Sequence, residues 1–293
     1  MHGPIGFQDY WLEVQGYAGK NLLKLIADSC LDKGIGITAI TSDEDEIPRN
    51  SIHDRFNYLK NKFALTLPEG YEFDTLGKHV GIVVRNGEVL YILNGQTVRT
   101  DDRGRYVDYL VVGENKIRNH LDLEETMKAI YDKPTLIGGA EHGLCEDHHG
   151  IGEKRMRELM QYMSFVEGHN SQLIFPVPAF VPKFGQYRRT LNDGAQKIAK
   201  EYGKPWIATS DAHRIKDAGI SYIEFDLDNL DFSDGYKFWT SLRKTIESGN
   251  FTNHLDYESF FGWTDWVSSY ILGTKLGRDK KSERGMMQGK NWN

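Results

Sequence analysis

Residues 206–213 read Trp206-Ile-Ala-Thr-Ser-Asp-Ala-His213, and they indicate both a fold class and the position of a site. The first four residues are mostly apolar and predict a short buried strand over Trp206–Thr209. A carboxylate and an imidazole, Asp211 and His213, follow this strand directly. In parallel α/β proteins the functional side chains gather at the carboxyl ends of the strands. The segment therefore predicts a strand that opens into a functional site.

Three other predicted strands end in the same kind of residues. Thr135–Ala140 runs into Glu141-His142, the strand Phe165–Glu167 runs into His169-Asn170, and Ile35–Thr41 runs into Ser42-Asp43-Glu44. Imidazole and carboxylate are the ligands that Zn, Mn and Fe use, and a pair of such ions can clamp both oxygens of a phosphoryl displacement. Four strand ends that deliver these groups to one rim therefore indicate a metal site.

Helices and strands alternate along the rest of the chain. Helical spacing of apolar residues predicts helices over Leu22–Leu31, Leu123–Tyr131, Glu153–Met163, Asn192–Tyr202 and Tyr236–Glu247. Further strands are predicted over Val80–Arg85 and Glu88–Leu93, on either side of the hairpin signal Asn86-Gly87, and over Tyr106–Val112 and Tyr222–Phe225. This alternation is typical of βα units around a mainly parallel sheet, and a closed barrel and an open sheet both fit it. The proline-containing segment Phe175–Tyr187 is predicted to be an ordered loop that serves as a lid.

Composition limits the class of protein. The 293 residues are 39% hydrophobic, which supports a sizeable core, and they suit one large α/β domain or two small ones. The formal net charge of -6 argues against a non-specific nucleic-acid coat but leaves a nucleic-acid substrate open. The two cysteines form no disulfide framework, and no apolar run reaches the ~20 residues that span a bilayer. We therefore expect a cytoplasmic protein that does not enter a membrane.

Five segments carry a family resemblance. In chain order they are Gly36-Ile-Thr-Ala-Ile-Thr-Ser-Asp43, Asn94-Gly-Gln-Thr-Val98, Gly139-Ala-Glu-His-Gly143, Val166-Glu-Gly-His-Asn-Ser171 and Ala208-Thr-Ser-Asp-Ala-His213. In this order they resemble the motifs of the polymerase and histidinol phosphatase (PHP) family of metal-dependent phosphoesterases. The last segment is the most specific, and the resemblance spans roughly residues 1–250.

The resemblance implies an α/β fold of the distorted (β/α)7, TIM-like barrel type, with a PHP-like domain over 1–250. It implies hydrolysis of a phosphomonoester, nucleotide or nucleic-acid phosphodiester by metal-activated water, with one to three divalent ions of Zn, Mn or Fe. The metal ligands that it implies are His2, Asp43, His142, His169, Asp211 and His213. Asp211, His213 and His142 are the catalytic residues that it implies.

The chain departs from the family pattern at the start. The opening motif retains only His2, Asp43 stands where the family has histidine, and Gln96 stands where it has a bridging glutamate. A neutral amide binds a divalent metal more weakly than a carboxylate does. The alternative function is therefore a catalytically impaired PHP-fold protein that acts as a binding or assembly subunit.

Several other residues are candidates for the rim of the site. Glu141, Cys145, His148 and His149 accompany His142 as metal or rim residues, and Arg155, Arg188 and Arg189 are candidate contacts of a substrate phosphate. The loop Gly150–Arg157 also suggests a nuclease that holds a nucleic-acid backbone, although its glycines equally serve to start a helix. Over 251–293 we expect a C-terminal aromatic helix and a basic tail, through which an oligomer or a partner protein could bind.

Overall fold

The computed structural model describes residues 17, 19–42, 55–114, 116–173, 182–259, 261, 262, 264, 265 and 268. For residue 42 and residues 182–189 it describes the backbone but not the side chain. The predicted metal ligands His2 and Asp43 lie outside the described residues, as does most of the predicted C-terminal helix and tail.

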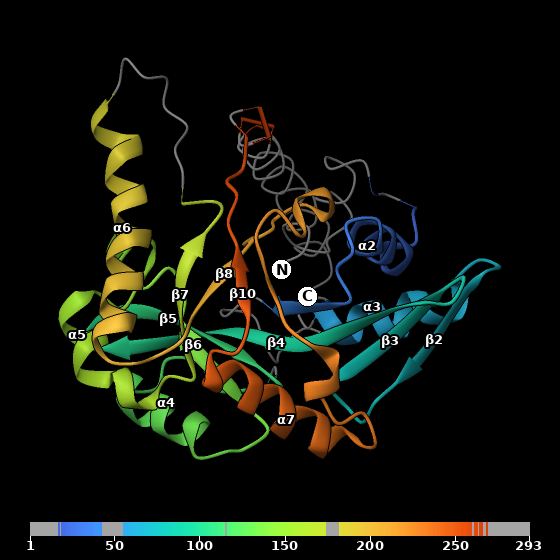
Figure 1. The fold of residues 1–293 in the computed structure, drawn as a ribbon, viewed down its shortest axis with the longest axis horizontal. Helices are drawn as coiled ribbons and strands as arrows, with labels where there is room; N and C mark the ends of the chain where they lie inside the picture. The colour runs from blue at the N-terminus through green and yellow to red at the C-terminus, as the bar shows by residue number, and fades with distance from the viewer. Residues whose placement is uncertain are drawn as a thin grey trace, which may run out of the picture.

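One mixed sheet forms the centre of the molecule (Figure 1). Its strands are β1 (Ile37–Ser42), β2 (Tyr71–Thr75), β3 (Val80–Arg85), β4 (Glu88–Asp102), β5 (Arg105–Val112), β6 (Ile137–Ala140), β7 (Phe165–Asn170) and β8 (Trp206–Thr209). The order is β2-β3-β4-β5-β6-β7-β8, and β1 pairs in parallel with β4. Neighbours from β2 to β6 are antiparallel, whereas β6, β7 and β8 are parallel. A separate antiparallel pair is formed by β9 (Tyr222–Glu224) and β10 (Thr252–His254).

Helices pack on the outside of this sheet. They are α2 (Leu22–Leu31), α3 (Arg55–Phe63), α4 (Leu123–Tyr131), α5 (Glu153–Leu159), α6 (Pro182–Glu201) and α7 (Gly235–Ser248). In Figure 1, α2 and α3 lie at the β2–β3 end, α4 and α5 lie at the opposite end, and α6 stands beside β7. Three groups of buried apolar side chains result, one under α2 and α3, one under α4, α5 and α6, and one under α7. None of the helices in the described part of the chain is both long and apolar enough to span a membrane.

The α/β class is confirmed, but a closed barrel is not: within the described residues the sheet stays open between β1 and β8. One cause is visible at the outer edge of β8. There the side-chain amide of Asn253 takes the place of a neighbouring strand, because its Oδ1 accepts from the Ala208 N–H (2.7 Å) and its Nδ2 donates to the Trp206 carbonyl (3.0 Å). The expectation of a mainly parallel sheet also needs correction, since the run from β2 to β6 is antiparallel.

Most predicted elements are present, and several of them differ in length from the prediction. The Asn86-Gly87 hairpin is confirmed, and both residues have the positive φ (49° and 91°) that a tight type I′ turn requires. The strand predicted over Glu88–Leu93 continues to Asp102, because its second half pairs with β5 after its first half has paired with β3. Helix α6 begins at Pro182, so the predicted lid is helical at its end; proline is well tolerated in the first turn of a helix.

Candidate active site

Three carboxylates lie in or just after three adjacent parallel strands. Glu141 follows β6, Glu167 is in β7, and Asp211 follows β8. Glu141 and Glu167 are only 2% and 3% exposed, and the Asp211 side chain is 11% exposed. All three line the same cavity, which has a volume of about 650 Å³. The sheet therefore gathers negative charge at one end of an internal cavity.

Glu167 accepts three hydrogen bonds from other described residues. Its Oε2 accepts hydrogen bonds from the backbone N–H of His142 and from Nδ2 of Asn170, and its Oε1 accepts one from the Thr209 hydroxyl. Burial raises the pKa of this carboxyl to about 6, and the nearby negative charge of Asp211 adds to the effect. Glu167 is thus a carboxyl that changes charge close to neutral pH.

Asn170 joins two of the carboxylates. Its Nδ2 lies 3.2 Å from Glu167 Oε2 and 3.1 Å from Asp211 Oδ2, while its Oδ1 accepts from the backbone N–H of Gln172 at 2.9 Å. Asn170 is fully buried, so these bonds are not shared with solvent. One neutral amide therefore holds two like charges side by side.

Two site residues have an unusual backbone conformation. His142 and Asp211 have φ values of +33° and +43°, in the left-handed region that side chains other than glycine seldom adopt. Each lies two residues after the end of its strand, His142 after β6 and Asp211 after β8. Such strain persists where the surroundings impose it, and it concentrates at functional sites. The Nδ1 atom of His142 is also buried, with no hydrogen-bond partner among the described residues.

The predicted histidines are not all brought together. His213 lies beside Asp211, with Nδ1 2.8 Å from the Asp211 carbonyl oxygen and 3.8 Å from Asp211 Oδ1. His169 is directed elsewhere: its Nε2 lies 2.8 Å from the Asp256 carbonyl, and its ring packs on Tyr257 at 4.5 Å. A register shift between Glu167 and His169 accompanies this difference in direction. Burial lowers the pKa of His169, which favours the neutral ring.

The described residues fit a divalent cation only in part. A buried cluster of carboxylates beside an imidazole is the donor chemistry that such an ion requires, and Glu167 and Asp211 form the core of that cluster. Among the described side chains, however, no three His, Cys, Asp or Glu groups are arranged to hold a metal ion. The His142, His169 and Asp211 set predicted from the sequence is therefore not assembled as one three-ligand group.

The other rim candidates have varied surroundings. Gln96 is fully buried, and its side-chain amide forms two hydrogen bonds with the backbone of Ile117. Its Nε2 donates to the Ile117 carbonyl at 2.9 Å, and its Oε1 accepts from the Ile117 N–H at 3.0 Å. Cys145 is buried, whereas His148 is exposed with its ring 6.5 Å from that of His142. His149 has a left-handed φ of 62° and its carbonyl accepts from the Asp108 N–H.

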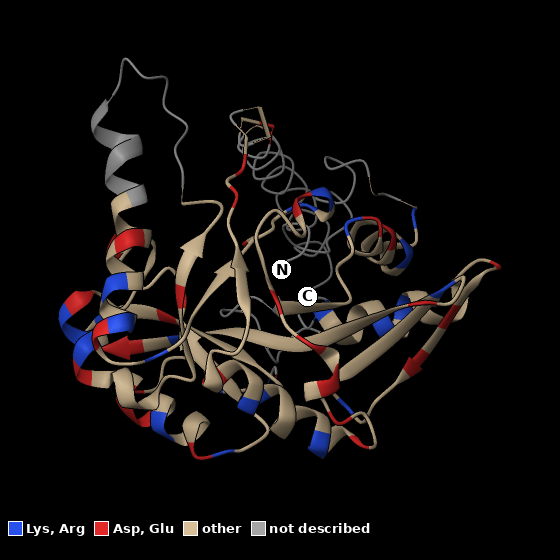
Figure 2. Ribbon diagram, in the orientation of Figure 1, with Lys and Arg blue, Asp and Glu red and all other residues tan. Residues whose placement is uncertain are grey.

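The candidate phosphate contacts are largely engaged with acidic side chains. Arg155 is 12% exposed and forms ion pairs with Asp102 (3.1 Å), Glu124 (3.5 Å) and Glu158 (2.6 Å). Figure 2 shows Lys, Arg, Asp and Glu interspersed along α5, so this face is not uniformly basic. These contacts give no support to the predicted role of Arg155. Arg188 and Arg189 lie in α6, where their side chains are outside the description.

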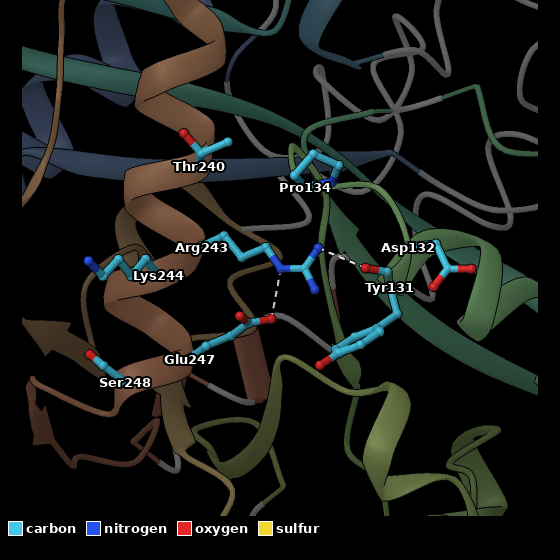
Figure 3. Close-up of a pocket in the computed structure, with 8 residues that line it drawn as sticks. All are labelled: Tyr131, Asp132, Pro134, Thr240, Arg243, Lys244, Glu247 and Ser248. Atoms are coloured by element: carbon cyan, nitrogen blue, oxygen red, sulfur yellow. Dashed lines mark hydrogen bonds and ion pairs between the residues drawn. The ribbon is translucent and has the colours of Figure 1, made fainter.

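A second hollow, of about 560 Å³, lies between the end of α4 and helix α7 (Figure 3). Its central Arg243 stacks on the ring of Tyr131 at 4.8 Å and donates to the carbonyls of Tyr131 and Lys133. The same guanidinium binds Glu247 at 2.7 Å. Arg243 therefore ties α7 to the turn after α4, and we assign this hollow no chemistry.

A buried ion cluster anchors the loop that follows His213. Arg214 is 3% exposed and binds Asp217 through two hydrogen bonds of 2.6 and 2.7 Å. It also contacts Glu258 at 3.1 Å and Asp265 at 2.8 Å, in the segment after β10. Burial raises the pKa of Asp217 to about 6, against the opposing effect of Arg214. This cluster fixes the chain on the far side of the site.

Sequence reasoning missed the central residue of the site. Glu167 was seen as the end of a strand and Asn170 as part of a motif, and neither was predicted to act. The alternation Phe165, Glu167 could have revealed it, because residues two apart in a strand share a face. A carboxylate on the inward face of a buried strand is unusual enough to mark a site.

Comparison with known proteins gives one family match. The model of the family described as PHP-associated matches residues 189–236, which include Asp211 and His213, and it confirms the resemblance there. No curated protein sequence matches the chain. Among solved structures, the chain is similar to Endonuclease Q in complex with a 27-mer duplex substrate with an abasic lesion at the active site, with 13% identity and a TM-score of 0.39. The similarity covers 84% of this chain and 56% of that one, so the chain spans little more than half the length of that enzyme.

Proposed function

We propose that this chain, a relative of the PHP family, hydrolyses phosphoesters with the help of a divalent metal ion at the carboxylate end of its internal cavity. The observation that supports the proposal is the meeting of Glu167 and Asp211, two buried carboxylates that share one amide donor beside an imidazole. A bound cation there would supply charge that polarises the phosphoryl oxygens and activates water.

The residues of the chain have separate parts in this proposal. Asp211 and Glu167 would hold the cation, and His142, whose charge acts on Glu167, is an imidazole that could join them. Asn170 keeps the two carboxylates aligned. His213, whose ring is oriented by the Asp211 carbonyl, would meet the phosphoryl group at the rim. We further propose that His2 and Asp43, which lie outside the described residues, complete the donor set.

The test is hydrolysis of an aryl phosphate monoester and an aryl phosphate diester, each with added Mn²⁺ or Zn²⁺ and each with EDTA. We expect activity that EDTA removes and that Asp211→Asn lowers by about 100-fold or more, since even residues behind the ligands cost 10–100-fold. Glu69→Gln is the matched control, because Glu69 is an exposed carboxylate in the turn before β2. Equal activity of Asp211→Asn and the parent protein would refute the site assignment.

A second function is favoured by Gln96. Its amide is saturated by Ile117 and by Asn119 (3.1 Å), so this position is built into the loop rather than offered to a metal. A glutamine that is bonded within the protein and not available to a metal is expected of a non-catalytic PHP-fold subunit that binds or assembles with a partner. Protein that retains no Mn or Zn by mass spectrometry after dialysis, and that hydrolyses neither ester, would select this alternative.

A further inference from the structure

The internal cavity changes character along its length. Four parallel strands contribute an apolar residue and then, further toward the carboxyl end, a polar one. The pairs are Ile37 and Thr41 from β1, Ile137 and Glu141 at β6, Phe165 and Glu167 in β7, and Ile207 and Asp211 at β8. Because the strands run the same way, Ile37, Ile137 and Phe165 lie toward one end of the cavity and Asp211 lies toward the other. Glu167, which stands opposite Ile207 in the sheet register, lies where the apolar and acidic linings meet.

The side chains that the structure describes leave the apolar end open. Leu110, Ile207, Ile223 and Phe225 line the cavity and are only half-buried, although they belong to or pack against the apolar group under α7. Leu242 and Ile246 of α7 close the same space from outside the sheet. A volume of about 650 Å³ is within the range of small-molecule sites, whereas ordinary protein interiors leave few voids larger than a water molecule.

The shape of the space restricts what can fill it. From Ile37 to Thr41 a strand advances about 13 Å, at about 3.3 Å a residue. With carbon–carbon bonds of about 1.5 Å, an extended chain of roughly ten carbons covers this length. Water is a poor occupant of an apolar space, because it needs several polar partners.

We propose that the substrate is a phosphoester of a long apolar alcohol, with its phosphoryl group at Glu167 and Asp211 and its alkyl or isoprenyl chain in the apolar end. This inference rests on the proposed function for the position of the phosphoryl group. The apolar chain is assigned independently, by the half-buried side chains that line the cavity.

The test compares ethyl, hexyl, octyl and decyl phosphate as substrates of the full chain with Mn²⁺. We expect kcat/KM to rise by about two- to fourfold for each added methylene, as burial of a CH₂ predicts, and to level off near ten carbons. Ala39→Leu, which adds bulk to the lining of β1, should move this plateau to shorter chains. Ala129→Leu, on the exposed face of α4, should leave the whole series unchanged.

A binding measurement separates this inference from the proposed function. Decylphosphonate is titrated calorimetrically into the parent protein with Mn²⁺, and its P–C bond is not hydrolysed. We expect it to bind at least about 50-fold more tightly than ethylphosphonate, because each added methylene that is buried strengthens binding. Such binding without turnover of any ester would support the apolar site and refute the phosphoesterase proposal. Hydrolysis that is indifferent to chain length, with equal binding of both phosphonates, would overturn the inference and leave the phosphoesterase standing.

Discussion

Glu167→Gln should change how the stability of the protein depends on pH. The carboxyl of Glu167 is 3% exposed, and its pKa is raised from the ordinary 4.5 of a glutamate to about 6, first by burial and then by Asp211. A glutamine at this position can keep every hydrogen bond: its oxygen can accept from the His142 N–H and from Asn170, and its amide can donate to the Thr209 hydroxyl. The substitution therefore removes the titration while it preserves the packing.

The sign and size follow from proton linkage. A raised pKa means that the folded protein binds this proton more tightly than the unfolded chain does, so the stabilisation is complete below pH 4.5 and is lost as the pH rises through 6. The folded and unfolded pKa values of Glu167 differ by about 1.5 units, which corresponds to about 2 kcal/mol in the free energy of unfolding. At pH 4.5 the free energies of unfolding of Glu167→Gln and the parent should be nearly equal, and at pH 8 the variant should be about 2 kcal/mol more stable.

Urea unfolding in EDTA at pH 4.5, 6 and 8 measures this difference directly. Titrating groups that do not act on Glu167, Asp217 among them, are common to both proteins and cancel in the comparison. Glu69→Gln is the control, and as an exposed substitution it should shift the free energy by less than about 0.5 kcal/mol at every pH. A difference between Glu167→Gln and the parent that stays constant from pH 4.5 to 8, or that falls, would show that Glu167 is not a buried carboxyl among like charges.

Three further substitutions test the surroundings of the site. Asn170→Ala removes the donor that two buried carboxylates share, so it should cost about 1–3 kcal/mol in urea unfolding, and more at pH 8 than at pH 5. Arg214→Met leaves Asp217 buried without its cation and should cost about 3–5 kcal/mol at pH 8; the loss should shrink at pH 5, where a protonated carboxyl is easier to bury. Gly139→Ala would drive a methyl group into the ring of Phe165, so its melting temperature should fall by an amount that corresponds to about 1–3 kcal/mol.

The elements that the sequence predicted well are those whose signals are local. Val80–Arg85, Trp206–Thr209 and Leu22–Leu31 have the predicted bounds, because a strand of alternating or continuous apolar residues and an amphipathic helix are each specified within a few residues. The open edge of the sheet could not be predicted in this way. In the described part of the chain, the edge of Trp206–Thr209 is occupied by the amide of Asn253, more than forty residues from β8.

In the candidate site, too, the features with local sequence signals were predicted and those that depend on distant residues were not. Asp211 and Glu141 stand at strand ends that the sequence predicted, and both line the cavity. His169 was placed at the same rim by its position after a strand, but the strand continues through it and the register shifts, so its ring meets Asp256 instead. A single-residue change in register moves a side chain to another face, and nothing in the local sequence reports it.

Glu167 and Asp217 are both buried carboxyl groups with a pKa of about 6, but the charged groups around them differ. At Asp217 the chain supplies a guanidinium, Arg214, at 2.6 and 2.7 Å, and the pair is satisfied within the fold. At Glu167 the neighbours that raise the pKa are Asp211 and Glu141, the positive contribution comes from an imidazole, and the group lines a cavity. Buried charge that the chain does not neutralise itself must be protonated or met by a cation from solution. Glu167 faces this choice near neutral pH, in a cavity large enough for a substrate, and this is the physical reason to expect a metal here.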